Sequence, residues 1–561
     1  MVARVLLAFV YWSCLAHVLL DVGVRLGTCG GGVATAADFS RAGGLFGVRW
    51  ASVHVRGSLM EMSEKQLKES FVRNLNGTSI TEITLGLSIT PLCILFRGLI
   101  FIYLYQNTGK VVYSWKYCLV LDFFLLVLPQ VLSCTILSDY LCLVVVCVSV
   151  MCTLGFYMIY NNRIFYKNTY LLNVFQCFLN TTIEEQNVPS VTNFRVFMNL
   201  LTAICILAVD FPIFPRRYAK TETYGTGIMD LGVGCFTFAN GLISPEARSQ
   251  NKEKTSTFHT VEKQIFAVWP LIFLGLGRLI SVKAVDYHEH VSEYGVHWNF
   301  FFTLALVRVI SSSLLTFIPV QKIWIVAIVI IFSYQIVLET TDLKTFILQS
   351  SNNKDTRHGF LNANREGILS AIGYVTIYLC GVQIGSYLLK KRIYVKEWIE
   401  LLVKFTIFSV MAFFSMIIVQ IYVEPISRRM ANLTFCIWTI GQCMAWLCKI
   451  FLCDLILVFV KYLIPGSSVP NTWNICDKYS HQKNAPHLKC RKKKFCLIEA
   501  INRNQLLFFF HSNIMTGIVN LLVDTIRSNS LSALIVLLTY MFLNCLISCI
   551  LHVSNITVKW W

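Results

Sequence analysis

Long apolar runs recur along the chain and are separated by short polar segments. Each run has about 20 residues, the length that a helix needs to cross the roughly 30 Å hydrocarbon core of a membrane. We therefore predict an all-α, polytopic integral membrane protein with about 13 transmembrane helices in one bundle. The predicted spans centre on residues 84–105, 118–137, 139–160, 194–210, 226–244, 263–282, 297–319, 321–339, 367–389, 398–422, 432–463, 506–523 and 530–552. The eleventh run is long enough to hold a second span.

Residues 1–59 differ in pattern from the rest of the chain. They begin with an apolar run, followed by a stretch rich in Gly and Ala that has no periodicity. This is typical of a signal-like segment, or of an extension upstream of a working start at Met60 or Met62. The abrupt change after Met62 favours the second interpretation. We expect residues 1–59 to lie outside the fold and residues 60–561 to form one membrane domain, with a surface loop at 464–505.

Composition supports a membrane protein and argues against other classes. Of the 561 residues, 56% are hydrophobic and 14% are charged, whereas about a quarter of a soluble domain is charged. The net charge of +18 comes from basic residues scattered over short loops. We expect no nucleic-acid binding, because that needs basic residues on one soluble face. Many of the 21 cysteines lie in apolar runs, and no CxxC pair has zinc-ligand spacing, so we expect no metal site.

Basic loops predict the orientation in the membrane. Residues 390–392 and 491–494 mark the cytosolic side by the positive-inside rule. Counting spans back from them places the glycosylation sequon at Asn76 in the lumen, with a luminal N-terminus and a cytosolic C-terminus. An alternative for the run at 491–494 is a phosphate or CoA site. Other sequons, expected to face the cytosol or to lie too close to the membrane, begin at Asn180, Asn432 and Asn555.

Ionisable residues at the edge of a span are costly and are therefore candidates for function. The densest cluster follows the fourth span, between Asp210 and Asp230, and begins with two prolines that disfavour a continuing helix. Its cations Arg216, Arg217 and Lys220 lie on the predicted luminal side, against the positive-inside trend. Asp210 and Lys220 together could carry proton transfer. A structural ion pair between them is the alternative.

A second polar cluster precedes the seventh span. A zinc-protease HExxH motif starting at His288 fails, because Ser292 stands where the second His is needed. Glu293 and His297 are four residues apart and would share one face of a helix. A His oriented by a carboxylate is a common general base. The alternative is a belt of His and Trp side chains at the lipid head groups.

A third group lies just before the ninth span and consists of Asn362, Asn364, Arg365 and Glu366. Amides beside a cation and a carboxylate suit recognition of a polyol or a phosphate, and a helix N-cap is the alternative. The segment 427–432 is similar. In the twelfth span, Asn513 shares a helix face with Asn520, which interhelical hydrogen bonding would explain. These polar clusters are also compatible with a lipid transporter or scramblase, because polar residues inside a membrane mark substrate pathways too.

Five segments together resemble a known family, that of PIG-W and the GPI-anchored wall transfer protein. Its members are inositol acyltransferases of glycosylphosphatidylinositol (GPI) anchor synthesis. The resemblance begins at Met62 and covers roughly 500 residues. The segments that carry it are 208–222, 224–234, 293–302, 361–367 and 427–433.

The resemblance implies an acyltransferase of the endoplasmic reticulum membrane. It would move a palmitoyl chain from acyl-CoA, its co-substrate, to the inositol ring of glucosaminyl-phosphatidylinositol, without a cofactor. Asp210 would be the general base, with Lys220 aiding it or stabilising the thioester oxygen, and His297 the second choice. The residues expected to bind substrate are Arg216, Arg217, Tyr224, Asp230, Glu293, Asn299, Asn362, Asn364, Arg365 and Asn513. A non-catalytic subunit of a glycolipid-synthesising complex is a further alternative.

Overall fold

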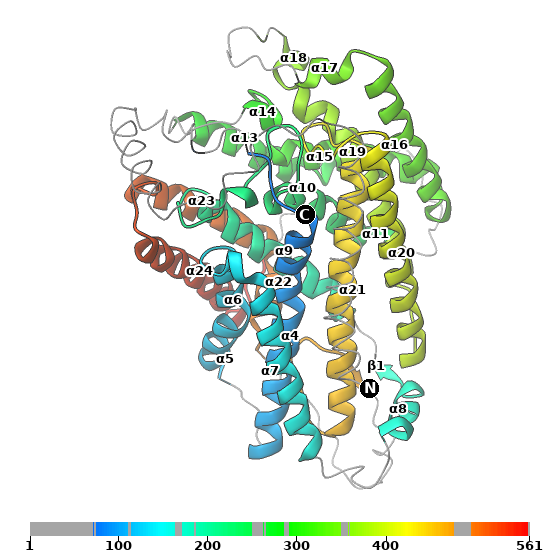
Figure 1. Ribbon diagram of the computed structural model, residues 1–561, viewed down its shortest axis with the longest axis vertical. Helices are drawn as coiled ribbons and strands as arrows, with labels where there is room; N and C mark the ends of the chain where they lie inside the picture. The colour runs from blue at the N-terminus through cyan, green and yellow to red at the C-terminus, as the bar shows by residue number, and fades with distance from the viewer. Residues whose placement is uncertain are drawn as a thin grey trace, which may run out of the picture.

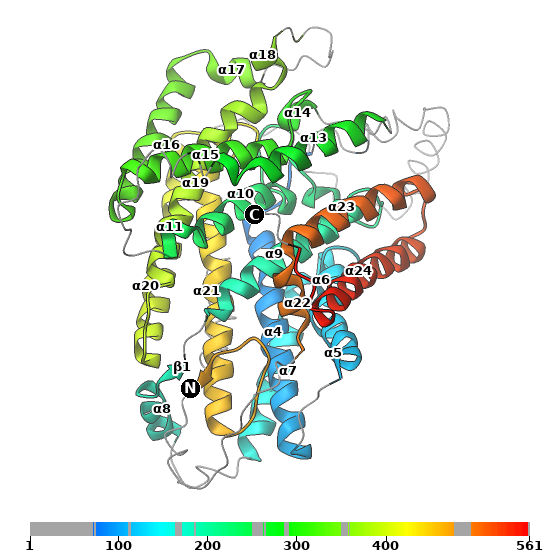
Figure 2. The same ribbon diagram turned by 180° about the vertical axis from the view of Figure 1, so that it is seen from behind.

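The computed structural model describes the chain from residue 71 onward, with gaps. The described residues are 71, 75–109, 114–162, 171–184, 187–248, 262, 265–284, 291–348, 357, 359–475 and 495–558. They form a helical bundle with two very short strands (Figures 1 and 2), which confirms the prediction of an all-α membrane fold. The predicted N-terminal extension and the basic run at 491–494 lie outside the described residues.

Each of the 13 predicted segments holds a helix. Among the described residues, 11 helical segments are long and apolar enough to cross a membrane. They are α4 (Ile80–Thr108), α5 (Trp115–Asp122) continued through η1 (Phe123–Val127) and α6 (Leu128–Ser133), α7 (Leu141–Asn161), α9 (Pro189–Ala208), α15 (Phe300–Phe317), α16 (Ile323–Thr340), α19 (Arg365–Leu388), α20 (Val395–Tyr422), α21 (Leu433–Leu463), α23 (Gln505–Leu522) and α24 (Ser530–Val553). The other two, α10 (Ile228–Leu242) and α13 (Trp269–Ala284), are shorter apolar helices, so the count of 13 spans stays a prediction. The alternative of two spans in 432–463 is wrong, because α21 is one continuous helix of 31 residues.

Short elements connect these helices. They are η2 (Ser138–Tyr140), α8 (Leu171–Leu179), η3 (Arg216–Tyr218), α11 (Pro245–Arg248), α14 (Val291–Tyr294), η4 (Val320–Lys322), α17 (Leu343–Leu348), α18 (Phe360–Ala363) and α22 (Leu497–Arg503). Strand β1 (Ile183–Glu184) pairs antiparallel with β2 (Asn474–Ile475).

Helix α21 forms the centre of the bundle, between α4 and α20 (Figure 1). In its most apolar stretch 94% of the residues are buried, against 22% in α20. Polar contacts fix it to its neighbours: the Lys449 ammonium donates to Ser88 Oγ on α4 at 2.5 Å, and Asp454 accepts from Ser190 Oγ on α9 at 2.8 Å. Inside a membrane such pairs are strong restraints on helix register.

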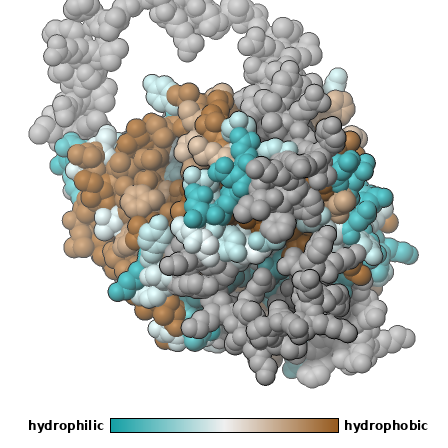
Figure 3. Space-filling model, turned by 90° about the horizontal axis from the view of Figure 1, so that it is seen from below, coloured by the Kyte–Doolittle hydropathy of each residue, from teal (hydrophilic) through white to brown (hydrophobic). Residues whose placement is uncertain are grey.

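The outer helices expose apolar side chains. Leu143 on α7, Val329 on α16 and Phe414 on α20 are all more than half exposed. Seen from below, the described residues form a broad hydrophobic area on one side of the molecule (Figure 3). Such a surface suits contact with lipid tails.

The predicted surface loop at 464–505 is packed in its described parts, so that prediction is wrong for them. Trp473 is buried, with its ring centroid 4.9 Å from that of Trp398 on α20. The Leu497 N–H at the start of α22 donates to Asp122 Oδ2 at 3.1 Å. Although the segment is mostly polar, the Trp473 ring and the apolar first turn of α22 are buried, because their exposure to water is unfavourable.

Close packing of α10 against α19 depends on glycine. A Cβ on Gly241 would lie 2.3 Å from the Tyr378 carbonyl oxygen, whereas a Cβ on Gly232 of the same helix would meet nothing within 4 Å. We expect Gly241→Val to lower the free energy of unfolding by about 1–3 kcal/mol, because the added side chain forces the two helices apart. Gly232→Val is the matched control, and thermal unfolding in detergent is the measurement. Equal melting temperatures for the two variants would contradict this account.

The loops that carry the candidate residues meet at one end of the bundle, which we call the site end. Backbone bonds join them: Thr78 N–H donates to Thr226 O at 2.6 Å, and Val296 N–H donates to Ala363 O at 3.0 Å. Helices α14 and α18 lie at this end, while α8 and β1 lie at the other (Figure 1). The described segments at the site end are 75–82, 138–139, 209–227, 291–299, 357, 359–366 and 423–432.

Exposed Asn76 lies at the site end, beside the 221–227 loop. The basic residues 390–392 lie at the opposite end, where Ile393 O accepts from Ile183 N–H of β1 at 3.0 Å. This separation agrees with the predicted topology. Which end faces the lumen, and glycosylation of Asn76, stay predictions.

Candidate active site

Four charged side chains of alternating sign lie in a row at the site end, and we call them the ion-pair chain (Lys220, Glu293, Arg428 and Asp230). The Lys220 ammonium lies 2.7 Å from each Glu293 carboxylate oxygen. Glu293 Oε1 is 3.8 Å from Arg428 Nη1, and Arg428 Nε donates to Asp230 Oδ1 at 2.7 Å. The chain ties together three parts of the sequence, around residues 220–230, 293 and 428, and it has two cations and two anions.

Asp230 and Arg428 form the buried part of this chain. Their side chains are 0% and 5% exposed. The Asp230 carboxylate also accepts from Gly227 N–H at 2.9 Å and Thr221 N–H at 3.1 Å, which fixes the preceding loop to the start of α10. These contacts explain why the loop after α9 turns back on itself. Asp230 is therefore a positioning residue for Lys220.

Lys220 forms the open part of the chain. Its side chain remains 34% exposed, which leaves room for a substrate beside the ammonium. The surrounding bundle desolvates that ammonium and lowers the pKa of Lys220. Nearby Glu293 opposes this effect and raises the pKa, and Arg428 and Arg278 lower it further.

Asp210 follows α9, two residues after its last residue Ala208, and lies beside α23. Its Oδ2 accepts a hydrogen bond from Asn520 Nδ2 at 2.7 Å. The structure pairs Lys220 with Glu293 and not with Asp210, which corrects the predicted ion pair. The partner of Lys220 lies 73 residues away, so spacing in the sequence could not reveal it.

The two arginines after α9 bind partners within the protein. Arg216 Nη2 donates to the carbonyl oxygens of Val209 and Phe211, both at 2.9 Å, and so closes the proline turn. Arg217 pairs with Glu82 at 2.9 Å and Asp139 at 2.6 Å. These contacts support a structural role, and the predicted phosphate contact of both arginines is left for experiment.

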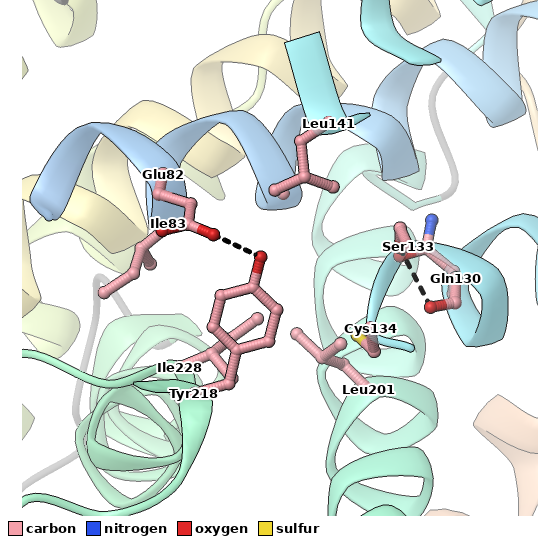
Figure 4. Close-up of a pocket in the computed structure, with 10 residues that line it drawn as sticks. Glu82, Ile83, Gln130, Ser133, Cys134, Leu141, Leu201, Tyr218 and Ile228 are labelled. Carbon is pink, nitrogen blue, oxygen red and sulfur yellow. Dashed lines mark hydrogen bonds between the residues drawn. The ribbon is translucent and has the colours of Figure 1, made fainter. Parts of the chain in front are cut away.

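A small cavity lies next to this turn, between α4, α6, α9 and α10 (Figure 4). Its volume of about 10 Å³ is enough for one water molecule. Glu82 and Tyr218 face it, and the Tyr218 hydroxyl donates to Glu82 Oε1 at 2.7 Å. The cavity is far too small for an acyl chain.

Glu293 and His297 do not share a helix face, so that prediction is wrong. Helix α14 ends at Tyr294, and Gly295 adopts φ +106°. A Cβ on Gly295 would lie 2.5 Å from Ala363 O, so only glycine fits this turn. His297 is exposed, and its backbone N–H donates to Asn364 Oδ1 at 2.8 Å. His288, at which the zinc-protease motif fails, lies outside the described residues.

The predicted asparagines mainly hold backbone and neighbouring side chains. Asn299 caps α15 by accepting from Phe301 N–H at 3.0 Å. Asn362 Oδ1 accepts from Arg365 Nη1 at 3.1 Å. Asn513 Nδ2 donates to the Phe509 carbonyl oxygen of its own helix at 2.7 Å. Asn364 likewise accepts from the His297 backbone N–H. These contacts support a positioning role for all four asparagines.

A family model described as GWT1 matches residues 64–551. The chain belongs to the GWT1 family. It is 46% identical over 507 residues to "Glucosaminyl-phosphatidylinositol-acyltransferase PIGW" of Bos taurus, covering 89% of this chain and 100% of the relative. The protein of that name from Homo sapiens is 44% identical over 505 residues, with the same coverage. "GPI-anchored wall transfer protein 1" of Saccharomyces cerevisiae is 35% identical over 543 residues, covering 88% of this chain and 99% of the relative.

Sequence reasoning missed a central carboxylate of this GWT1-family site. Glu424 accepts from the Tyr224 hydroxyl at 2.8 Å and from Asn432 Nδ2 at 3.0 Å, and it pairs with Lys344 at 2.8 Å. The sequence offered one clue to Glu424: it lies just after the apolar run of α20, and ionisable residues at the edges of spans are candidates for function. Tyr224 is thus anchored from the loop after α20, and buried Asn432 caps α21.

Proposed function

We propose that this chain transfers a fatty acyl group, typically palmitoyl, from acyl-CoA to the inositol hydroxyl of glucosaminyl-phosphatidylinositol in GPI-anchor biosynthesis. The observation that carries the proposal is 46% identity over the full length of a relative named for this acyltransferase. A multi-pass membrane fold suits it, since both substrates are amphiphiles. We place the protein in the endoplasmic reticulum membrane, with a luminal N-terminus and a cytosolic C-terminus.

The reaction needs a base, a site for a negative oxygen and a proton for the leaving group. In our proposal the Asp210 carboxylate takes the proton of the inositol hydroxyl. The inositol oxygen then forms a bond to the thioester carbonyl carbon, and the negative carbonyl oxygen is stabilised by the Lys220 ammonium. When the C–S bond breaks, the carbonyl re-forms, and the CoA thiolate leaves with the proton that Asp210 took from the inositol hydroxyl, which restores the Asp210 carboxylate. Exposed His297 is the second choice for the base.

Separate neighbours hold the two side chains of this proposal. Asn520 orients Asp210, and Glu293 holds Lys220. Tyr224, Asp230 and the asparagines shape the site end through the contacts described above. In this mechanism acyl-CoA is a co-substrate, and no cofactor is needed.

Lipid mass spectrometry tests the proposal in cells that lack this activity. Membranes from such cells should contain unacylated glucosaminyl-phosphatidylinositol, and expression of this chain should convert it to the inositol-acylated lipid. Conversion should fail when acyl-CoA synthesis is blocked. A protein that inserts normally but leaves the lipid unacylated would contradict the proposal. Redistribution of unacylated lipid between leaflets would instead indicate a transporter.

The lowered pKa of Lys220 predicts the alkaline limb of the pH profile. Acyl transfer should fall as pH rises through this pKa, below the ordinary lysine value of 10.5, because the protonated form is needed. Glu293 raises this pKa, so Glu293→Gln should move the limb to lower pH. The control is Asp524→Asn, which removes an exposed carboxylate between α23 and α24. Initial rates across pH are the measurement, and a limb that stays in place in Glu293→Gln would refute this role.

A further inference from the structure

Helix α23 carries a polar stripe (Ser512, Thr516 and Asn520) that leads to Asp210. The three residues are spaced four apart, so they lie on one face of the helix. Ser512 and Thr516 are buried on this face, and α23 packs against α9 and α24. The polar stripe therefore points into the bundle, towards the helix that Asp210 follows.

Tyr540 on α24 fixes the polar stripe against α9. Its hydroxyl lies 3.1 Å from the Ala203 carbonyl oxygen on α9 and 3.2 Å from the Ser512 carbonyl oxygen on α23. Thr516 Oγ1 donates to the same hydroxyl at 3.4 Å. A buried polar contact shared by three helices limits how far α23 can turn or slide along α9. Asn520, about two turns beyond Ser512, is thereby held beside Asp210.

The Asn520 amide is oriented at both ends. Its Nδ2 donates to Asp210 Oδ2 at 2.7 Å, and its Oδ1 accepts from Thr525 Oγ1 at 3.4 Å. A carboxylate can only accept, so the amide must present Nδ2 to Asp210. Thr525 is buried and favours the same orientation. A short bond from this donor stabilises the charged form of the carboxylate, which is the form that a general base needs.

We propose that Asn520 is the positioning residue of the general base: its amide keeps the Asp210 carboxylate charged and turned towards the inositol hydroxyl. The polar stripe and Tyr540 hold the amide in place. Helix α23 thus contributes to the reaction although only 22% of its most apolar stretch is buried. This assignment rests on the proposed function, in which Asp210 is the base.

Charged groups on the neighbouring segments are Arg216, in the same turn as Asp210, and the Asp524–Arg527 pair just after α23. Burial lowers the pKa of Arg216 to about 10, and the charge of Asp210 opposes this effect. Arg216 therefore keeps its charge throughout the acidic range. Asp524 and Arg527 lie 3.8 Å apart and largely offset each other. A change at low pH in a variant of Asn520 consequently reports on the amide and not on these charges.

The pH profile of acyl transfer by the purified protein tests the proposal. Asn520→Leu keeps the size of the side chain but removes the donor, so the acid limb should move up by about 1–2 pH units, as expected for loss of a charge-assisted hydrogen bond. On the plateau kcat should fall by about 10- to 100-fold, since the carboxylate can turn away. The KM values for palmitoyl-CoA and glucosaminyl-phosphatidylinositol should not change. The matched control is Asn161→Leu, at the exposed end of α7 remote from the site end, which should alter neither limb nor kcat.

A second variant separates positioning from a merely structural role. Asn520→Asp keeps the shape of the side chain, so a structural role predicts the wild-type rate. Our proposal predicts a lower rate at pH 7 than that of Asn520→Leu, because two adjacent carboxylates disfavour each other's charge. This variant decides the matter if Asn520→Leu does not fold, and a wild-type rate or an unmoved acid limb would overturn the proposal. An inactive, folded wild type would contradict the proposed function. An active wild type, an inactive Asp210→Asn and unaltered Asn520 variants would contradict only the role of Asn520.

Discussion

Replacing Asp210 with asparagine is expected to reduce acyl transfer by about 10²–10⁴-fold, because the inositol hydroxyl loses its base. Lys220→Met should cause a loss of about 10²–10³-fold, since nothing then stabilises the thioester oxygen. Both variants keep the shape of the side chain, so the protein should remain inserted and folded. The rate of labelled acyl transfer by purified protein is the measurement.

Two matched variants control for the loss of a charge. Asp524→Asn and Lys322→Met each remove one charge from an exposed side chain away from the ion-pair chain, and both should retain full activity. Turnover by Asp210→Asn at the wild-type rate would remove Asp210 from the mechanism and make His297 the base to test.

The second large effect is on stability. Asp230→Ala leaves Arg428 buried without its closest partner and also removes the acceptor for two loop N–H groups. We expect the free energy of unfolding to fall by about 3–5 kcal/mol, as when one partner of a buried ion pair is removed. Denaturant unfolding in detergent would measure this.

An exposed ion pair provides the comparison. In the pair Asp524–Arg527 the two side chains are 53% and 60% exposed. Asp524→Ala breaks this pair and should lower the free energy of unfolding by at most about 1 kcal/mol. Adding Arg428→Met to Asp230→Ala should recover part of the loss, because the uncompensated charge is gone. A loss for Asp230→Ala no larger than that for Asp524→Ala would show that the buried pair contributes little.

The helices of this protein could be predicted because their signal is local. An apolar run of span length must become a helix in a membrane, where each backbone polar group needs a partner. All 13 predicted segments accordingly hold helices. Counting those segments also predicted that Asn76 and residues 390–392 lie at opposite ends of the bundle, as the structure has them.

The site could be predicted only as a set of loops. Which charges pair depends on how loops from distant spans meet, so Lys220 was expected beside Asp210 and lies beside Glu293. The expected face shared by Glu293 and His297 assumed a continuing helix, which Gly295 ends. Glu366 was expected in a polar group with its neighbours, but its partner Arg357 attracted no attention, because that residue alone does not depart from an ordinary polar loop.

The most direct measurement is acyl transfer by the purified wild-type protein in detergent, with labelled palmitoyl-CoA and glucosaminyl-phosphatidylinositol. Our account predicts inositol-acylated product when both substrates are present, and none when either is omitted. Absence of product from protein that is shown to be folded would contradict it.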